Sequence, residues 1–545
     1  MVTIVLNKYK LLDKIHIGQQ KLEDLLFNLK SEVKPIDENN IEIEINADRL
    51  DLLSSDGIAR AIKGLLEKEL GEAKYNVTDT EYTLIVDNVR TRPYALAAIV
   101  YNAKIDLEEL IQFQEKLHGT IGRKRKKVAI GIHDLRKVDS KTIEYKEVPL
   151  SYKFVPLYGN KELTISEILE KTEQGKLYGN ISIANGVSPA IVQDDGEVLS
   201  IPPIINSNKT RLDENTKDFF IDVTGTSFEA VAQTLDIIVS NLAEAGGTIG
   251  RVKVLKSANS SQLSSPLFLH KIQNVREEYV KKILGIKTSK EEICKHVMRM
   301  RMNCDIENGV IRVTVPQYRV DILNEIDVVE DIAMSIGYNN LEPSKYISTN
   351  YGSYDYMTLL ERKIRELGIG AGYVEISNFV LIKDEKLFSN KYVKILNPVT
   401  EEYNAVRDSL IPGLLDFLSK NQHAKFPIRV FETGDVVVYD SSTDTGFRND
   451  KRAAYAIMDN KVSYEDIQAP IHYILKSLGL EVNYKEENNN IFIEGRSASI
   501  FYENEKMGVI GEVNPDVLIR FGIEYPAVIA ELYISEIGKR LTNQR

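Results

Sequence analysis

The stretch PQYRVDILNEIDVVEDIAMSIGY, residues 316–338, is the most informative part of this sequence, because a strand-like approach leads into a helix that carries clustered acids. Asp327, Glu330 and Asp331 are spaced i, i+3 and i+4, so a helix puts them on one face. Asp321 precedes them, just after the strand-like run at 310–315. No lysine separates the four carboxylates, and like charges that lie together cost free energy unless a cation offsets them.

Two interpretations of this acidic cluster remain open from spacing alone. Oxygen ligands suit Mg²⁺, which takes few protein carboxylates, so Asp321, Asp327, Glu330 and Asp331 are candidate ligands of one ion. The same acids in the first turn of a helix would also favour the helix dipole without any metal. Arg319 lies just outside the cluster, and we treat the four acids as unpaired.

Composition limits the classes of protein that the chain can belong to. Its 545 residues, 43% hydrophobic and 27% charged, are ordinary for a globular protein of roughly three to five domains. A net charge of −11 argues against a protein that coats nucleic acid, so any RNA contact must be local or shared with a partner.

The N-terminus has no signal-peptide pattern, and no apolar run of about 18 residues exists that could span a membrane. The only cysteines, Cys294 and Cys304, have no CxxC partner and make a poor start for a zinc site. We therefore expect reduced thiols, a cytoplasmic location and no membrane contact.

The pattern of elements predicts an α+β multidomain protein with four parts. Residues 1–85 read as a small α/β unit, and residues 86–255 as a mixed α/β domain that contains the densest basic run, Arg123 to Lys127. Residues 266–345 form a helix-rich unit with a hairpin-like strand, typical of winged-helix relatives. Residues 350–545 alternate strands and helices around a predicted antiparallel sheet.

Seven sequence blocks, in order along the chain, resemble the β subunit of phenylalanyl-tRNA synthetase of the archaeal and eukaryotic-cytosolic type. They are NADRLDLLSSDGIAR (46–60), RPYALAAIV (92–100), IPPIINSNKTRL (201–212), FIDVTGTS (220–227), VPQYRVDILNEIDVVEDIAMSIGYNNLEP (315–343), VRDSLIPGLL (406–415) and GVIGEVNPDVL (508–518). The resemblance implies a holoenzyme that joins L-phenylalanine to tRNA(Phe) with ATP, in which this chain pairs with a catalytic α subunit as an (αβ)₂ heterotetramer. It also implies that the partner binds most of the ATP, and that this chain supplies scaffold, a Mg²⁺ site and tRNA contacts.

The same resemblance implies that residues 86–255 are an editing domain that hydrolyses tyrosyl-tRNA. A hydrophobic phenylalanine pocket cannot strongly reject an analogue that only adds a hydroxyl, so a separate hydrolytic site is needed. Asp222 and Thr224 match the family motif and are candidates to bind the phenol, with Ser200 as a further candidate. Glu115 and Arg125 are candidates to act near the terminal adenosine. The alternatives are that Thr224 only ends a strand and that the basic run is a solvated surface.

The C-terminal part resembles a class II synthetase catalytic domain that lacks its chemistry. Residues 429–432 only loosely match the motif whose arginine holds the ATP α-phosphate, and Glu512 stands where a phosphate-binding cation is needed. We expect an inactive copy that supports the partner subunit. His133 and Asp134 suggest catalysis, but we attribute them to a turn at a strand end. A different class of function also fits the sequence: a non-catalytic RNA-binding or scaffold protein that kept the fold and lost editing.

Overall fold

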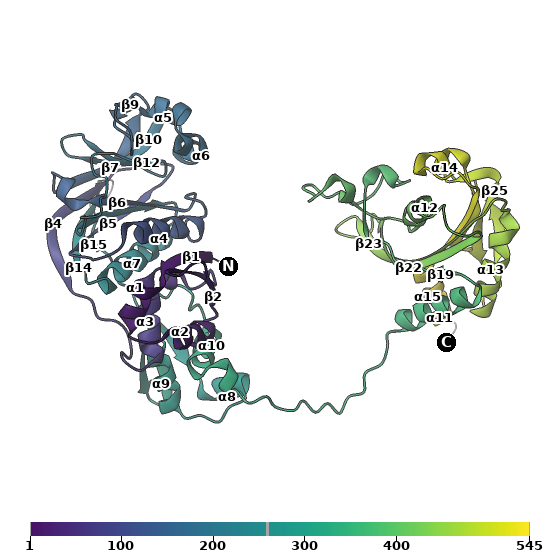
Figure 1. Ribbon diagram of the computed structural model, residues 1–545, viewed down its shortest axis with the longest axis horizontal. Helices are drawn as coiled ribbons and strands as arrows, with labels where there is room; N and C mark the ends of the chain where they lie inside the picture. The colour runs from purple at the N-terminus through teal and green to yellow at the C-terminus, as the bar shows by residue number, and fades with distance from the viewer. Residues whose placement is uncertain (1, 258–260, 544–545) are drawn as a thin grey trace. The chain divides into compact units, whose positions relative to one another are not determined.

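The structure, a computed structural model, describes residues 2–257 and 261–543, which divide into two compact units between Tyr346 and Ile347 (Figure 1). Both units mix helices with sheets, which confirms the α+β class. Within the described residues, no helix is both long and apolar enough to cross a membrane.

The first unit begins with a small sheet in the order β1-β3-β2, whose strands are β1 (Val2–Asn7), β2 (Glu32–Pro35) and β3 (Asn40–Ile45). Ile41, Ile43 and Ile45 are buried, while the glutamates between them are only partly covered, so β3 has one face in the core. The helices of this region are α1 (Lys8–Ile15), α2 (Gln19–Asn28) and α3 (Ser55–Leu65).

A ten-stranded sheet follows, and it carries the candidate site. The strand order is β12-β11-β10-β7-β4-β14-β5-β13-β6, with β15 paired to β14. The strands are β4 (Val77–Val86), β5 (Tyr94–Tyr101), β6 (Val128–Asp134), β7 (Thr142–Pro149), β10 (Val187–Gln193), β11 (Val198–Ile201), β12 (Ile205–Asn206), β13 (Phe219–Gly225), β14 (Thr248–Lys256) and β15 (Gln262–Ser265). The accompanying elements are α4 (Leu107–Gly119), β8 (Lys153–Phe154), β9 (Leu163–Thr164), α5 (Ile165–Lys171), α6 (Glu173–Ser182) and α7 (Phe228–Glu244).

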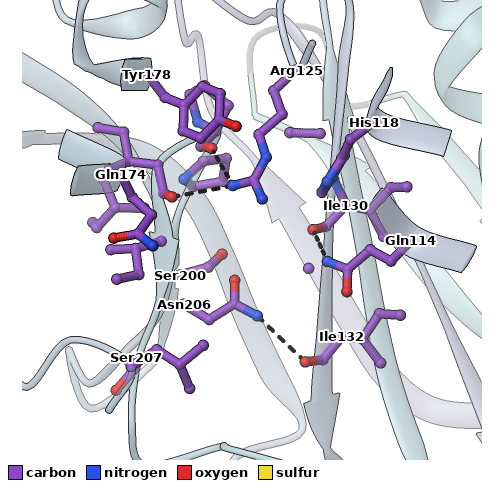
Figure 2. Close-up of a pocket in the computed structure, with 18 of the residues that line it drawn as sticks. Gln114, His118, Arg125, Ile130, Ile132, Gln174, Tyr178, Ser200, Asn206 and Ser207 are labelled. Carbon is purple, nitrogen blue, oxygen red and sulfur yellow. Dashed lines mark hydrogen bonds between the residues drawn. The ribbon is translucent and has the colours of Figure 1, made fainter. Parts of the chain in front are cut away.

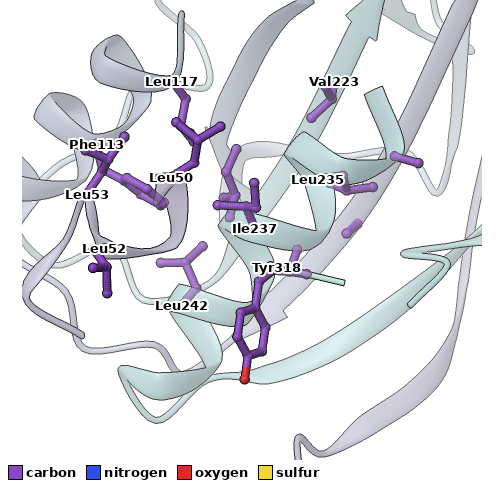
Figure 3. Close-up of a cluster of buried hydrophobic side chains, with 14 of the residues drawn as sticks. Leu50, Leu52, Leu53, Phe113, Leu117, Val223, Leu235, Ile237, Leu242 and Tyr318 are labelled. Carbon is purple, nitrogen blue, oxygen red and sulfur yellow. The ribbon is translucent and has the colours of Figure 1, made fainter. Parts of the chain in front are cut away.

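The last part of the first unit is a three-stranded sheet with three helices. Its strands, in the order β16-β18-β17, are β16 (Lys271–Val275), β17 (Asn303–Glu307) and β18 (Val310–Val315), and its helices are α8 (Glu277–Leu284), α9 (Lys290–Arg299) and α10 (Glu325–Ile336). One hydrophobic core joins this part to the two regions before it. Figure 3 shows that core, with residues from the segments at 50–53, 113–117, 235–242 and Tyr318.

Cys294 and Cys304 form a disulfide bond, so the expectation of two reduced thiols is wrong. Cys294 lies on α9 and Cys304 on β17, and the chain folds back between them until their Cα atoms are 5.3 Å apart. That separation lies in the usual range for a disulfide. The spacing of the two cysteines in the sequence does not indicate that the chain folds back between them.

The second unit is built on a seven-stranded sheet in the order β19-β22-β23-β27-β26-β25-β24. Its neighbours are antiparallel except β19 and β22, so the predicted antiparallel sheet is confirmed. The strands of this unit are β19 (Val374–Glu375), β20 (Leu381–Ile382), β21 (Ala405–Val406), β22 (Ile428–Tyr439), β23 (Phe447–Met458), β24 (Asn483–Glu486), β25 (Phe492–Tyr502), β26 (Glu505–Val513) and β27 (Ala527–Tyr533).

Two separate cores cover this second sheet. One includes side chains of α11 (Tyr356–Gly370), α13 (Tyr464–Ser477) and α15 (Ile534–Asn543), and the other includes those of α12 (Ile411–Lys420) and α14 (Pro515–Phe521). The sheet is therefore buried on both faces, as expected for a layered α+β domain.

Candidate active site

A cavity of about 670 Å³ lies in the region of the ten-stranded sheet, bordered by β6, α4, α6 and the segment from β11 to β12 (Figure 2). Backbone carbonyls of β6 form part of its wall, where Gln114 donates to Ile130 O at 2.8 Å and Asn206 donates to Ile132 O at 3.4 Å. Four of the five predicted site residues line the cavity: Glu115, Arg125, Ser200 and Asp222. The structure thus gathers residues that are far apart in the sequence.

Asp222 lies on β13 directly opposite Gly131 of β6. Its carboxylate is buried, and Oδ1 lies 2.9 Å from His133 Nε2, while His133 Nδ1 lies 2.7 Å from Thr210 Oγ1. A Cβ atom on residue 131 would lie 2.3 Å from Asp222 Oδ1, so only glycine leaves room for the carboxylate above the strand. Asp222 is thereby fixed as a polar group facing the cavity.

Thr224 does not line the cavity, although it lies on the same strand as Asp222. Its Oγ1 accepts a hydrogen bond from Arg92 Nε at 3.4 Å, and its carbonyl accepts one from Arg92 Nη2 at 2.8 Å. Ser200, by contrast, lines the cavity, is 2% exposed, and has an Oγ without a hydrogen-bond partner among the described residues. A buried hydroxyl of that kind is a site where a polar ligand group would be stabilised.

Glu115 and His118 form a pair on α4. The N–H of Ile130 donates to His118 Nε2 at 2.9 Å, which leaves His118 Nδ1 to donate to Glu115 Oε1 at 3.0 Å. Burial lowers the pKa of His118, consistent with a neutral ring. Burial raises the pKa of Glu115, but the hydrogen bond from His118 and the charge of Arg125 outweigh this and lower it to about 2. Glu115 is therefore an ionised carboxylate at the cavity wall.

Arg125 connects three walls of the cavity (Figure 2). Its Nη2 donates to Glu115 Oε1 at 2.7 Å, and its Nη1 donates to Pro203 O at 3.1 Å and Ile204 O at 3.3 Å. The guanidinium also lies 4.5 Å from the ring centroid of Tyr178 on α6. These contacts hold α4, α6 and the segment after β11 around one cation.

The basic run forms the turn between α4 and β6. Arg123, Lys124 and Arg125 have φ values of 49°, 55° and 65°, so three successive non-glycine residues adopt left-handed backbone. Arg123, Lys124 and Lys126 are exposed, and no ion pair engages them within the described ranges. Lys124 and Lys126 line a second hollow of about 700 Å³, which shares Arg125, Glu115 and Tyr178 with the cavity.

The acidic cluster is paired, contrary to the expectation of free carboxylates. Arg319 binds Asp321 through two hydrogen bonds of 2.9 and 2.7 Å, and its Nη2 also lies 2.7 Å from Asp331. Lys30 lies 3.2 Å from Glu330. Asp327 accepts the backbone N–H groups of residues 323 and 324, as part of the capping box of α10 whose N-cap is Asn324. No group of three or more His, Cys, Asp and Glu that could hold a metal ion occurs in the described part of the chain.

Arginines of the second unit are also paired with carboxylates. Arg407 donates to the buried Glu432 at 2.6 Å, and Arg452 donates to Glu531 at 2.5 Å. Glu512, predicted to repel a triphosphate, pairs with Arg496 at 2.8 Å. Cations that are already paired in this way are poor candidates to hold phosphate.

Family models match three successive regions: the B3/4 domain at residues 86–238, the tRNA synthetase B5 domain at 273–338, and the phenylalanyl tRNA synthetase beta chain CLM domain at 344–534. The chain is 99% identical over 545 residues to the phenylalanine–tRNA ligase beta subunit of Saccharolobus islandicus, with all of both chains covered. It is 41% identical over 534 residues to the corresponding subunit of Aeropyrum pernix, with 96% of each chain covered. The chain belongs to the family of phenylalanine–tRNA ligase beta subunits.

A solved structure agrees with this assignment over part of the chain. An N-terminal fragment of the phenylalanyl-tRNA synthetase beta subunit from Pyrococcus horikoshii matches with a TM-score of 0.59 and 34% identity, covering 62% of this chain and all of that fragment. The archaeal relatives confirm the predicted family and type. As a beta subunit of phenylalanine–tRNA ligase, the chain is part of a heteromeric aminoacyl-tRNA synthetase.

Several residues of the site escaped the sequence analysis. His133 was attributed to a turn, but it lies within β6 and contacts Asp222, whereas Asp134 caps the short helix that follows. Gly131 and Arg92 act through contacts between distant segments, so no local pattern showed their roles, although Arg92 opens the block at 92–100. Only Gln114 had a local signal, because it directly precedes Glu115 on the same helix.

Proposed function

We propose that the cavity is the editing site of the ligase, where a tyrosyl ester of tRNA is hydrolysed. The holoenzyme joins L-phenylalanine to tRNA(Phe) with ATP in the cytoplasm, and this chain pairs with an α subunit as an (αβ)₂ heterotetramer. The partner subunit binds most of the ATP, and the second unit of this chain serves as an inactive class II-like scaffold. The observation that carries the editing role is a cavity with buried polar groups at Asp222 and Ser200 beside the ionised Glu115.

The polar groups supply the selectivity. The phenol hydroxyl of a tyrosyl group donates to the Asp222 carboxylate, and Ser200 Oγ is a second partner. A phenylalanyl ester leaves such buried groups unpaired, and each unpaired group costs about 1–3 kcal/mol. Two groups then give a preference on the order of 10²-fold for the tyrosyl ester. Thr224 assists by supporting the end of the strand that carries Asp222.

The hydrolytic step needs a positioned water and no covalent nucleophile, because an aminoacyl ester is already activated. Glu115 accepts a hydrogen bond from that water, and Arg125 donates to the ribose or phosphate of the terminal adenosine. The low pKa of Glu115 keeps it an acceptor throughout the physiological range. The remaining chemistry is displacement of the ribose oxygen from the ester carbonyl by water, which releases tyrosine and free tRNA.

The RNA strand reaches the cavity over the basic turn. Lys124 and Lys126 line the adjoining hollow and bind phosphates, which makes the RNA contact local in a chain of net charge −11. In the complete enzyme, the K124E/K126E variant should weaken hydrolysis of tyrosyl-tRNA and lower its salt dependence by a log–log slope of about 1–2. The K104E/K217E variant, with the same charge change at two exposed lysines of this region, is the control and should behave as wild type.

The resemblance also implies a Mg²⁺ ion at Asp321, Asp327, Glu330 and Asp331, and this stays a prediction. Two basic side chains and a helix N-terminus already engage these carboxylates, so as they lie they do not fit a shared ion. The D327A/E330A variant should lose Mg²⁺ content or assembly with the partner if an ion binds there. Normal Mg²⁺ content and normal assembly in this variant would show that the carboxylates form an ion-pair network without a metal ion.

The alternative is a subunit that has lost editing and serves only as an RNA-binding scaffold. The complete enzyme decides between the two when it is incubated with tyrosyl-tRNA and phenylalanyl-tRNA, with Asp222→Ala and Thr224→Val alongside. Editing predicts faster loss of the tyrosyl ester and a loss of that preference in Asp222→Ala. Equal hydrolysis of both esters by the wild-type enzyme would favour the scaffold.

A further inference from the structure

Arg92 is a buried cation that pairs with no carboxylate in the part of the chain that the structure describes. Among the described residues, six arginines have buried side chains, and the five other than Arg92 each pair with an Asp or Glu: Arg49, Arg60, Arg301, Arg319 and Arg407. Arg92 is 0% exposed and forms no such pair within the described residues. Buried charges are normally paired, so the partners that replace a carboxylate require an explanation.

Arg92 uses oxygen atoms of the site's own backbone in place of a carboxylate. Its Nη1 donates to Arg125 O at 3.1 Å and Lys126 O at 3.3 Å, and its Nη2 donates to Thr224 O at 2.8 Å. Its Nε contacts Thr224 Oγ1 at 3.4 Å. The carbonyl of Arg92 in turn accepts a hydrogen bond from the Tyr145 hydroxyl at 2.8 Å, which fixes the backbone of Arg92. One planar guanidinium therefore joins the basic turn to the end of β13.

The turn that Arg92 binds is conformationally unfavourable. Left-handed backbone at 123–125 brings each Cβ close to its following carbonyl, and three successive non-glycine residues bear that cost. Such a turn persists only where surrounding contacts determine it, and residues of this kind cluster at functional sites. The carbonyl of Arg125 accepts from Arg92, while the side chain of Arg125 reaches Glu115 and lines the cavity.

We propose that Arg92 is a positioning residue for editing, which acts by holding the left-handed turn so that Arg125 enters the cavity. This inference rests on the proposed editing function. Arg92 does not line the cavity, so its effect on hydrolysis passes through Arg125, while its contacts with Thr224 tie the turn to the end of β13. The proposal also gives Thr224 a role other than contact with the phenol, because the Thr224 oxygens anchor the guanidinium of Arg92.

The test is a double-mutant cycle in the complete enzyme, with R92M, R125A and R92M/R125A. Misplacing a contact group by about 1 Å can cost on the order of 10²-fold in rate, so R92M and R125A should each slow hydrolysis of tyrosyl-tRNA by roughly 10- to 100-fold. If Arg92 acts through Arg125, the double variant is no slower than R125A alone. A double variant slowed by the product of the two single effects would overturn the inference, as would an R92M variant with wild-type hydrolysis.

Two further readouts separate positioning from loss of folding. Formation of phenylalanyl-tRNA should be unchanged in all variants, and R92K, which keeps a buried donor, should recover part of the hydrolysis. The turn also contains successive trypsin sites at 123–127, and in R92M trypsin should cut there faster than in wild type. Equal cleavage rates would overturn the inference. If the wild-type enzyme hydrolyses no tyrosyl-tRNA, the proposed function fails, and the trypsin comparison still decides whether Arg92 holds the turn.

Discussion

Replacement of Gly131 by alanine tests the placement of Asp222 with one methyl group. The added Cβ would lie 2.3 Å from Asp222 Oδ1, 2.9 Å from its Cγ and 2.9 Å from His133 Nε2. A methyl carbon and an oxygen approach no closer than roughly 3.2 Å, so the carboxylate must withdraw by about 1 Å. The 2.9 Å contact between His133 and Asp222 cannot survive such a shift within a packed sheet.

The size of the expected effect follows from the displacement of the Asp222 carboxylate. A displacement of about 1 Å at a contact group costs on the order of 10²-fold in rate, and overpacking costs roughly 1–3 kcal/mol of folding stability. We therefore expect Gly131→Ala to slow hydrolysis of tyrosyl-tRNA by about 10- to 100-fold. Its preference for the tyrosyl over the phenylalanyl ester should largely disappear, and formation of phenylalanyl-tRNA should persist.

The assay compares release of tyrosine and phenylalanine from the two charged tRNAs by the complete enzyme. Gly370→Ala is the matched control, because it adds the same methyl group at the end of α11, where nothing lies within 4 Å of the new Cβ. Gly370→Ala should hydrolyse both esters at wild-type rates. If Gly131→Ala keeps the wild-type rate and preference, Asp222 does not bind the phenol and the reasoning is refuted.

Three other predictions concern the disulfide, pH and the second unit. Reduction of the bond between Cys294 and Cys304 should cost about 3 kcal/mol of local stability, so amide exchange in α9 should speed up by roughly 10²-fold in reductant, and unchanged exchange would contradict this. The folded-state pKa of Glu115 is depressed to about 2, so its ionised form contributes stability above the unfolded pKa near 4.3 and loses it only as pH falls toward 2; hydrolysis at pH 5 and pH 8 should therefore show no titration of this group. The isolated chain should make no phenylalanyl-adenylate, because Arg407 and Arg452 are paired with glutamates, and pyrophosphate exchange without the partner subunit would disprove this.

The family resemblance was sufficient to name several residues of the cavity. Asp222 lies in the block at 220–227, Ser200 directly precedes the block at 201–212, Glu115 and Arg125 lie between blocks, and the fold brings all four to one cavity. The alternation of side chains along strands also anticipated the sheets, because burial on one face imposes that period.

Prediction from the sequence failed where the partner of a residue lies far along the chain and strand order brings the two together. Nothing near residue 92 indicates that its guanidinium binds carbonyls at 125 and 224, because strand order decides that meeting. The expectation of unpaired acids in the acidic cluster failed for a reason that lies close by in the sequence. Arg319 and Asp321 are only two residues apart, and the long arginine side chain can reach a carboxylate at that spacing, so their pairing could have been predicted. The disulfide was missed because the rule that intracellular thiols stay reduced has exceptions among hyperthermophilic archaea, and the relatives of this chain are archaeal.

The partners of the buried arginines explain how an acidic chain keeps positive charge at the proposed site for RNA. A carboxylate beside Arg92 would have satisfied the guanidinium but would also have cancelled its charge. Backbone carbonyls satisfy the same hydrogen bonds and leave the positive charge in place, directly beneath the turn that exposes Lys124 and Lys126. Because burial reduces screening by water, that charge adds to the field of the exposed cations and favours phosphate binding there. The same residue thus fixes the geometry of the turn and retains the charge that its proposed substrate requires.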